Sequence, residues 1–184
     1  MKHLKKIRLI VIGLSALLSS TLSLHAASRA EMRNEAREAL NELYSATSAA
    51  RHVGESAKAV LVFPKIVKAG FVVGAQRGDG TLLSHGKAIG YFRTHAASYG
   101  LQAGVQRFGY ALFFMTDNDL DYLRRSGGWE IGTGPSVVII DEGMARSFTT
   151  TTQRKGVYAF AFGQRGLMAG LGLQGTKITR IHPD

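Results

Sequence analysis

Apolar residues first follow a helical spacing and then a strand-like spacing along this chain. Between residues 28 and 50 they recur every three or four positions, which predicts an amphipathic helix. Ser28 is a suitable N-cap for this helix, and Glu31 three residues later completes a capping-box pattern. From Lys68 onwards, short apolar runs alternate with small and polar residues, as is typical of β-strands. The pattern therefore places helix before sheet.

The strand-like part of the chain contains several punctuation signals. Pro64 should end a first apolar run, and the Asp79-Gly80 pair is a hairpin signal between two later runs. From these signals we expect a short second helix or turn over 52–59, a short helix over 117–125 and strands over 60–63, 69–76, 81–93, 98–115, 136–140, 157–162, 167–173 and 176–181.

Helices followed by many short strands indicate an α+β fold. We predict an N-terminal helix or helices packed on a curved, mainly antiparallel β-sheet or barrel. In one predicted strand the bulky Tyr158, Phe160 and Phe162 alternate with small residues. One face of the sheet should therefore carry a thicker core than the other.

Glycines recur four residues apart in the strand-like part of the chain. Residues four apart in a strand lie on the same face, so each pair should leave a bare patch where another layer or a ligand approaches the backbone. We predict that three such pairs form a scaffold, which by itself supplies no reactive group. The pairs are Gly70 and Gly74, Gly100 and Gly104, and Gly166 and Gly170.

The first 26 residues have the pattern of a secretory signal peptide. Four basic residues precede an apolar run over 9–24, and the small Ala26 ends a cleavage-site pattern. The alternative is an uncleaved anchor, but this run is shorter than the roughly 20 residues of a spanning helix. We therefore predict a leader over 1–26 and a single domain over 27–184, exported to the periplasm and peripheral to a membrane.

Composition and charge narrow the classes of function. The chain has no cysteine, which excludes a lipoprotein leader, disulfides and thiol chemistry. The leader carries four of the 23 Lys and Arg and none of the 13 Asp and Glu, so the remaining chain has a net charge of +6. An exported basic protein meets anionic lipid headgroups and envelope polyanions rather than nucleic acid. We therefore expect an anionic membrane surface as the partner, and no nucleic acid.

Basic residues gather in two places at the start of the predicted domain. Arginines at i, i+4 and i+8 form a ridge on the first helix, although like charges at that spacing destabilise a helix. The ridge is either a solvated face or a surface for phosphates. A second basic segment follows the helix. We predict that anionic phospholipid binds to Arg29, Arg33, Arg37, Lys58, Lys65 and Lys68.

Several catalytic and cofactor motifs can be rejected. The G-x-G-x-x-G pattern at 170–175 is followed by β-branched residues, not by the helix that a dinucleotide site needs. The acidic run at 117–121 lacks the later Gly and Glu of a calcium loop, and the histidines lack metal-binding spacing. Glu130 beside Trp129 is the remaining candidate for a general acid, and a local cap or ion pair explains it more simply. We predict a non-enzymatic protein without a metal or cofactor.

Four sequence blocks resemble, in order, a SYLF domain, the lipid-binding domain also known from a yeast actin-patch protein family. They are KAVLVFPKIVKAGFVVG at 58–74, SYGLQAG at 98–104, SGGWEIGTGPS at 126–136 and GLMAGLGLQGTKITRI at 166–181. With its leader, the chain resembles the secreted bacterial branch of this family. The resemblance implies phospholipid binding and no catalytic residues. It also implies actin binding for some members, but we expect no actin outside the cytoplasm.

Two other functions remain open at this point. The chain could be a structural or interaction protein of the envelope that binds a protein or polyanion partner through its sheet. It could also be a carrier that encloses an acyl chain inside the barrel.

Overall fold

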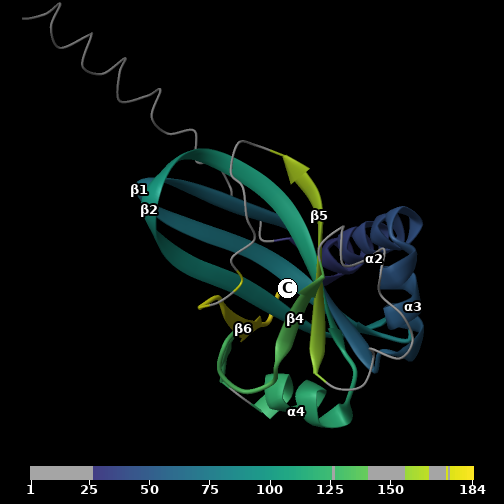
Figure 1. Cartoon of the computed structure of the whole chain (residues 1–184). Coiled ribbons are helices and arrows are strands. Elements are labelled where there is room, and N and C mark those ends of the chain that lie inside the picture. The colour runs from purple at the N-terminus through teal and green to yellow at the C-terminus, as the bar shows by residue number, and fades with distance from the viewer. Residues whose placement is uncertain (1–26, 126, 141–155, 166–172, 174) are drawn as a thin grey trace, which may run out of the picture.

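The computed structural model describes residues 27–125, 127–140, 156–165, 173 and 175–184. The predicted leader over 1–26 lies outside the described residues, as do Gly166, Gly170 and all but the last residue of the strand predicted over 167–173. Two N-terminal helices pack on a curled, mostly antiparallel sheet, which confirms the predicted α+β class (Figure 1). In chain order the elements are α2 (Arg29–Ala46), α3 (Ser48–Ser56), β1 (Ala59–Ser84), β2 (Lys87–Phe114), α4 (Asp117–Arg125), β3 (Trp129–Glu130), β4 (Val137–Ile140), β5 (Val157–Arg165) and β6 (Lys177–Ile181).

The predicted first helix is in fact two helices. Ser28 caps α2 as expected, because its Oγ accepts a hydrogen bond of 3.3 Å from the Glu31 amide. The backbone is extended at Thr47, and α3 begins at the next residue. The single helix expected over 28–50 is therefore wrong near its end, where a β-branched residue that is a weak helix former separates the two. The predicted stripe still packs inward, since Met32 and Leu43 are buried.

β1 and β2 form one long antiparallel ribbon that bends and folds back on itself. A register shift between Phe71 and Val73 marks the place where the ribbon turns over, at the end farthest from α2 and α3 (Figure 1). The two halves of β1 then lie side by side, since the Ser84 Oγ donates a hydrogen bond of 2.9 Å to the Lys58 carbonyl. Both ends of the ribbon therefore meet beneath the helices.

The folded ribbon is the centre of a half-barrel. One half of β2 pairs with β5 and the other half pairs with β6, both antiparallel. β4 extends the sheet beside β5 in parallel, and β3 extends it beside β6. With each half of β1 and β2 counted separately, the sheet has eight strand segments.

The hairpin turn lies at His85-Gly86, so the turn predicted at Asp79-Gly80 is wrong, and so are the bounds of the strands predicted on either side of it. The φ angles of His85 and Gly86 are 47° and 74°, and positive values at both central residues are the signature of a type I′ turn. Gly80 instead lies inside β1. A Cβ on Gly80 would lie 2.6 Å from the Val62 carbonyl oxygen, so this glycine lets the two halves of β1 approach closely.

β1 also passes through Pro64, where the first strand was expected to end. A register shift between Phe63 and Ile66 places Pro64 and Lys65 in a β-bulge. A bulge tolerates proline because the residue there need not donate to the ladder. The later elements agree with the sequence pattern, with α4 at the predicted residues and the strand ends shifted by at most a few positions.

The sheet has a packed core on each of its two faces. The inner core fills the curl of the sheet with large side chains, among them Phe63, Phe92, Tyr110 and Trp129. The outer core lies between the sheet and the two N-terminal helices. Tyr158, Phe160 and Phe162 all face this outer core, as the alternation predicted.

Candidate functional site

The predicted glycine scaffold forms the bend of the ribbon. Gly70 pairs with Gly104, and Gly74 lies just across the register shift from Gly70. A Cβ on Gly70 would overlap the Gly74 Cα and lie 2.7 Å from the Val73 carbonyl oxygen. The expected bare patch is therefore wrong at this pair, because the chain folds so sharply that the two glycines contact each other. Gly100 lies in the same bend on β2.

Apolar side chains are exposed at this bend, which we define as residues 65–77 of β1 and 95–107 of β2. Val73 is 64% exposed, and Val105 is 55% exposed. Val67, two residue pairs away from Val105 along the ribbon, is 38% exposed. These are three of the most exposed large apolar side chains among the described residues. Apolar groups left in water at a projecting end of a fold often mark a surface for a partner or membrane.

Basic residues lie on the same two strand segments as the exposed valines, and the bend contains no Asp or Glu. Arg107 lies directly opposite Val67, and both side chains are exposed. On the other half of the ribbon, Arg77 lies opposite His95, which in turn lies opposite Lys177 of β6. All three of these basic side chains are exposed. Lys177 also lies opposite Glu130 of β3, so Arg77 and Arg107 are the exposed arginines of the bend that have no acid opposite them.

The nearest acidic residue in sequence is Asp79, and an ion pair neutralises it. The Arg93 guanidinium donates two hydrogen bonds of 2.6 and 2.8 Å to its two carboxylate oxygens. This hydrogen bonding raises the pKa of Arg93, and desolvation opposes the rise. Asp79 is the single acid between residues 57 and 116, a stretch that holds seven Lys and Arg. Lys58 at the start of this stretch pairs with Asp117 of α4, whereas Lys65, Lys68, Arg77 and Arg107 of the bend form no ion pair among the described residues.

The three predicted arginines of α2 lie at the opposite end of the sheet from the bend (Figure 1). Arg29 donates from Nε to the Pro183 carbonyl at 2.7 Å, which ties the start of the helix to the end of the chain. Arg37 donates from Nε at 3.1 Å, and from a terminal nitrogen, to the Gly86 carbonyl in the hairpin turn. Arg33 contacts its neighbour Asn34 at 3.4 Å. Two of the three thus hold the fold together through carbonyl groups, and their role in lipid binding stays a prediction.

The three predicted lysines lie in different surroundings. Lys58 forms an exposed ion pair of 3.7 Å with Asp117 of α4. Lys65 is exposed in the bulge of β1, and Lys68 is half-buried opposite the buried Gln106. Only Lys65 and Lys68 therefore belong to the bend.

The half-barrel interior beneath the bend is polar as well as apolar. Gln76 donates a hydrogen bond of 3.3 Å to the Thr176 Oγ1, and both residues are buried. Deeper inside, the Tyr110 hydroxyl donates to the Thr94 Oγ1 at 2.8 Å. Burial raises the pKa of Tyr110, against a smaller lowering by this hydrogen bond. Because these buried polar groups hydrogen-bond to one another, they form part of the packed interior of the half-barrel.

Comparison with protein families matches residues 95–182 to the family described as Ysc84, Las17-binding protein actin regulator. This part of the chain resembles the Ysc84 family. The comparison with curated proteins gave no match. The matched segment begins in the bend and includes most of β2, together with α4 and β3 to β6. Domains of this family, also called SYLF domains, are generally non-catalytic and bind lipid.

Among the described residues of this chain, we recognise no catalytic or metal centre. Glu130, the candidate general acid, is exposed on β3 opposite Lys177, so it lacks the apolar pocket that this role needs. No group of three His, Asp or Glu among the described residues could hold a metal ion. In the same residues, no helix has both the length and the apolar character needed to cross a membrane.

Sequence reasoning missed the exposed residues of the bend, namely Val67, Val73, Val105, Arg77 and Arg107. A signal for them was present, because the bend has four Lys and Arg and no acid over its two strands. That signal indicates a basic surface only when the two strands are known to pair.

Proposed function

We propose that this protein is a non-enzymatic, peripheral binding protein for anionic phospholipid bilayers, and that it docks with the bend of the ribbon. The observation that carries this proposal is the pair of exposed valines, Val73 and Val105, among cations in a segment without acids. The lipid-binding character of SYLF domains supports it.

The chemistry of the bend suits the boundary between headgroups and acyl chains. The valines would enter the interface, where each loses contact with water. Lys65, Arg77 and Arg107 would remain at the phosphates, each contributing about 1 kcal/mol near an anionic surface. Because both contributions are small, binding should be reversible and should weaken as salt screens the charges.

The proposed location is the periplasmic side of an envelope membrane. It rests on the predicted leader over 1–26, the absence of cysteine and the net charge of the remaining chain. Fractionation of expressing cells, together with the N-terminal residue of the exported protein, tests this part of the proposal. A protein found in the cytoplasm with its first 26 residues intact would contradict it.

Sedimentation with vesicles tests the lipid proposal. The protein, purified from an exporting host, should sediment with phosphatidylglycerol-containing vesicles and remain in solution with pure phosphatidylcholine. The double variant Arg77→Gln/Arg107→Gln removes two charges from the bend and should bind about 30-fold more weakly, which corresponds to about 2 kcal/mol. The variant Val73→Thr/Val105→Thr keeps the β-branched shape and should also bind more weakly.

The matched control removes two charges elsewhere. Arg33 of α2 and Arg124 of α4 are away from the bend, and neither holds another element in place among the described residues. Arg33→Gln/Arg124→Gln should bind vesicles as the wild type does, apart from the small effect of net charge. Equal weakening in both double variants, or equal binding to neutral and anionic vesicles, would rule out docking through the bend.

The matching family is described as an actin regulator. We do not extend that role to this chain, because the proposed export separates the protein from cytoplasmic actin. An envelope polyanion is the main competitor for the same cations. Heparin or another soluble polyanion should bind without regard to Val73 and Val105, whereas bilayer binding should depend on them.

A further inference from the structure

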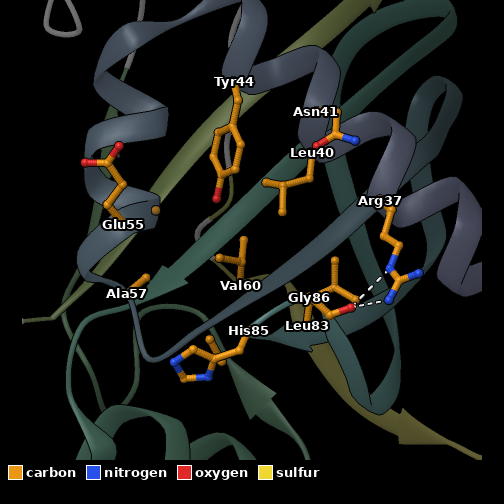
Figure 2. Close-up of a pocket in the computed structure, with 12 residues that line it drawn as sticks. Arg37, Leu40, Asn41, Tyr44, Glu55, Ala57, Val60, Leu83, His85 and Gly86 are labelled. Atoms are coloured by element: carbon orange, nitrogen blue, oxygen red, sulfur yellow. Dashed lines mark hydrogen bonds between the residues drawn. The ribbon is translucent and has the colours of Figure 1, made fainter.

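A second candidate site lies at the other end of the molecule from the bend. A cavity of about 410 Å³ opens between α2, the end of α3 and the hairpin turn at His85-Gly86 (Figure 2). It forms there because both ends of the folded ribbon meet under the helices, as the Ser84–Lys58 hydrogen bond shows.

The cavity has an apolar floor. Leu40 of α2 faces Val60 and Leu83, two buried side chains from opposite ends of β1 (Figure 2). Val60 and Leu83 belong to the outer core, and Leu40 packs against it. Leu40 is half-buried and borders the cavity, so an aliphatic group bound against this floor would be removed from water.

One end of the cavity is cationic. The Arg37 guanidinium holds the Gly86 carbonyl through two of its N–H groups, and a guanidinium has five. Three donors therefore remain available among the described residues. His85 also lines the cavity, but its ring lies away from the Arg37 guanidinium, with its Nδ1 3.2 Å from the Ser84 Oγ (Figure 2). The existing hydrogen bonds to Gly86 keep the guanidinium at the rim, so an anion would meet donors that are already positioned.

The other end of the cavity is mildly acidic. The Tyr44 hydroxyl points into it, and the structure gives this hydroxyl no hydrogen-bond partner among the described residues (Figure 2). Burial and then the negative charge of Glu55 raise the pKa of Tyr44. Seven residues along α2 separate Arg37 from Tyr44, which is roughly 10 Å at 1.5 Å per residue. An anion would thus be attracted to one end of the cavity and repelled from the other.

We propose that this cavity binds a single-chain anionic amphiphile, a fatty carboxylate in its simplest form. The carboxylate would accept hydrogen bonds from Arg37, and the chain would run over Leu40, Val60 and Leu83 towards Tyr44. The site is separate from the bend, so the proposal stands or falls independently of bilayer docking. It differs from the acyl carrier expected from the sequence, because the chain would lie under α2 and outside the half-barrel.

Three probes of equal chain length test the wild-type protein without any substitution. Octanoate, octanol and octylammonium are titrated below their micelle concentrations, and backbone amide shifts are followed by NMR. Octanoate should give saturable shifts at Leu40, Val60, Leu83 and Gly86, with octanol weaker and octylammonium weakest. Absence of saturable shifts with octanoate, or equal binding of octylammonium, would overturn the proposal.

Substitutions then test where the carboxylate and the aliphatic tail of the ligand bind. Arg37→Gln keeps a donor for the Gly86 carbonyl but removes the charge, and octanoate affinity should fall about tenfold towards that of octanol. Arg33→Gln removes the same charge one turn earlier on α2, outside the cavity, and should bind octanoate as the wild type does. Ala57→Leu adds bulk to the cavity wall and should weaken octanoate and octanol alike. Equal octanoate affinity in the two arginine variants would contradict the placement of the head.

The same variants distinguish this proposal from bilayer docking. Arg37→Gln should sediment with phosphatidylglycerol vesicles as the wild type does, while Arg77→Gln/Arg107→Gln should bind octanoate normally. If bound phospholipid headgroups were the true occupant, glycerol phosphate would displace octanoate from the cavity, and that result would also overturn the assignment to a fatty carboxylate.

Discussion

Gly80 packs against Phe63 from the other half of the same strand. A Cβ on Gly80 would overlap the Phe63 ring and lie 2.6 Å from the Val62 carbonyl oxygen. Gly80→Ala should therefore lower the free energy of unfolding by about 2–3 kcal/mol, as overpacked cores do, measured by urea denaturation. Gly127→Ala is the matched control, because a Cβ there meets open space, and it should change stability by less than about 0.5 kcal/mol. Equal stability of the two variants would contradict the close approach within β1.

Substitutions at Gly86 test the strain of its backbone conformation and not the room for a side chain. Its φ of 74° is positive, and a Cβ there would contact no neighbouring atom. Gly86→Ala should cost about 1 kcal/mol because an L-residue is strained in this conformation, while Gly86→Asn should cost less because asparagine tolerates it. Thermal unfolding should rank the proteins Gly, Asn, Ala from most to least stable. If the Asn and Ala variants lost the same amount of stability, the positive φ angle of Gly86 would not be the cause of the loss.

These two glycines show what local sequence patterns could and could not predict. Ser28 and the apolar spacing of α2 predict a helix because a cap and a stripe depend on neighbours within a turn. Asp79-Gly80 carries the local signal of a hairpin, yet the contact that uses Gly80 comes from residues 62 and 63. The true turn at His85-Gly86 carries a weaker signal. Pairing along the long ribbon decided between the two, and a single sequence does not reveal such non-local pairing.

The residues of the candidate site also divide into those that a local sequence pattern predicts and those that depend on non-local pairing. Lys65 and Lys68 were found because they lie close together in the sequence. Arg77 and Arg107 lie 30 residues apart and join one surface only after the ribbon pairs and folds. The arginines of α2 share a helix face, as their spacing predicted, but Arg29 and Arg37 also meet distant carbonyl groups. Periodicity identifies a shared face, and it does not identify what that face contacts.

Tyr110 should make the protein sensitive to alkali. Its phenol is fully buried, and burial raises its pKa above the value of about 10 found in an unfolded chain. Above pH 10 the unfolded chain therefore releases a proton that the folded protein retains. The stabilisation is complete below about pH 10 and is lost progressively as the pH rises further.

The variant Tyr110→Phe has no ionisable hydroxyl at this position. The variant should be less stable than the wild type at neutral pH by about 1 kcal/mol, because the buried Thr94 hydroxyl loses its partner. Between about pH 9 and 11.5, however, its stability should fall less steeply. Urea denaturation over a series of pH values measures both effects. Parallel curves for the two proteins would exclude Tyr110 as the source of the alkaline loss.

Asp79 should influence stability and lipid binding in opposite directions. Its bidentate pair with Arg93 is about one-third exposed, so Asp79→Asn should cost about 0.5–1 kcal/mol of stability. The same change frees the Arg93 charge beside the bend and should strengthen sedimentation with phosphatidylglycerol vesicles severalfold. Asp121→Asn on α4, which breaks an exposed pair with Arg125, is the control for net charge. A gain in vesicle binding of the same size in both variants would show that only total charge matters.

Gly70 links the shape of the bend to the proposed function. A methyl group on Gly70 would meet the backbone of Val73 and Gly74, so Gly70→Ala should open the fold of the ribbon at this point. We expect a loss of about 2 kcal/mol of stability and weaker sedimentation with anionic vesicles, although no charge and no valine has changed. Ala69→Ser, at the exposed neighbouring position, should retain both properties. Circular dichroism checks that the variant is folded before vesicles are added. A folded Gly70→Ala protein that binds vesicles like the wild type would show that the valines and cations act without the geometry that the glycines impose.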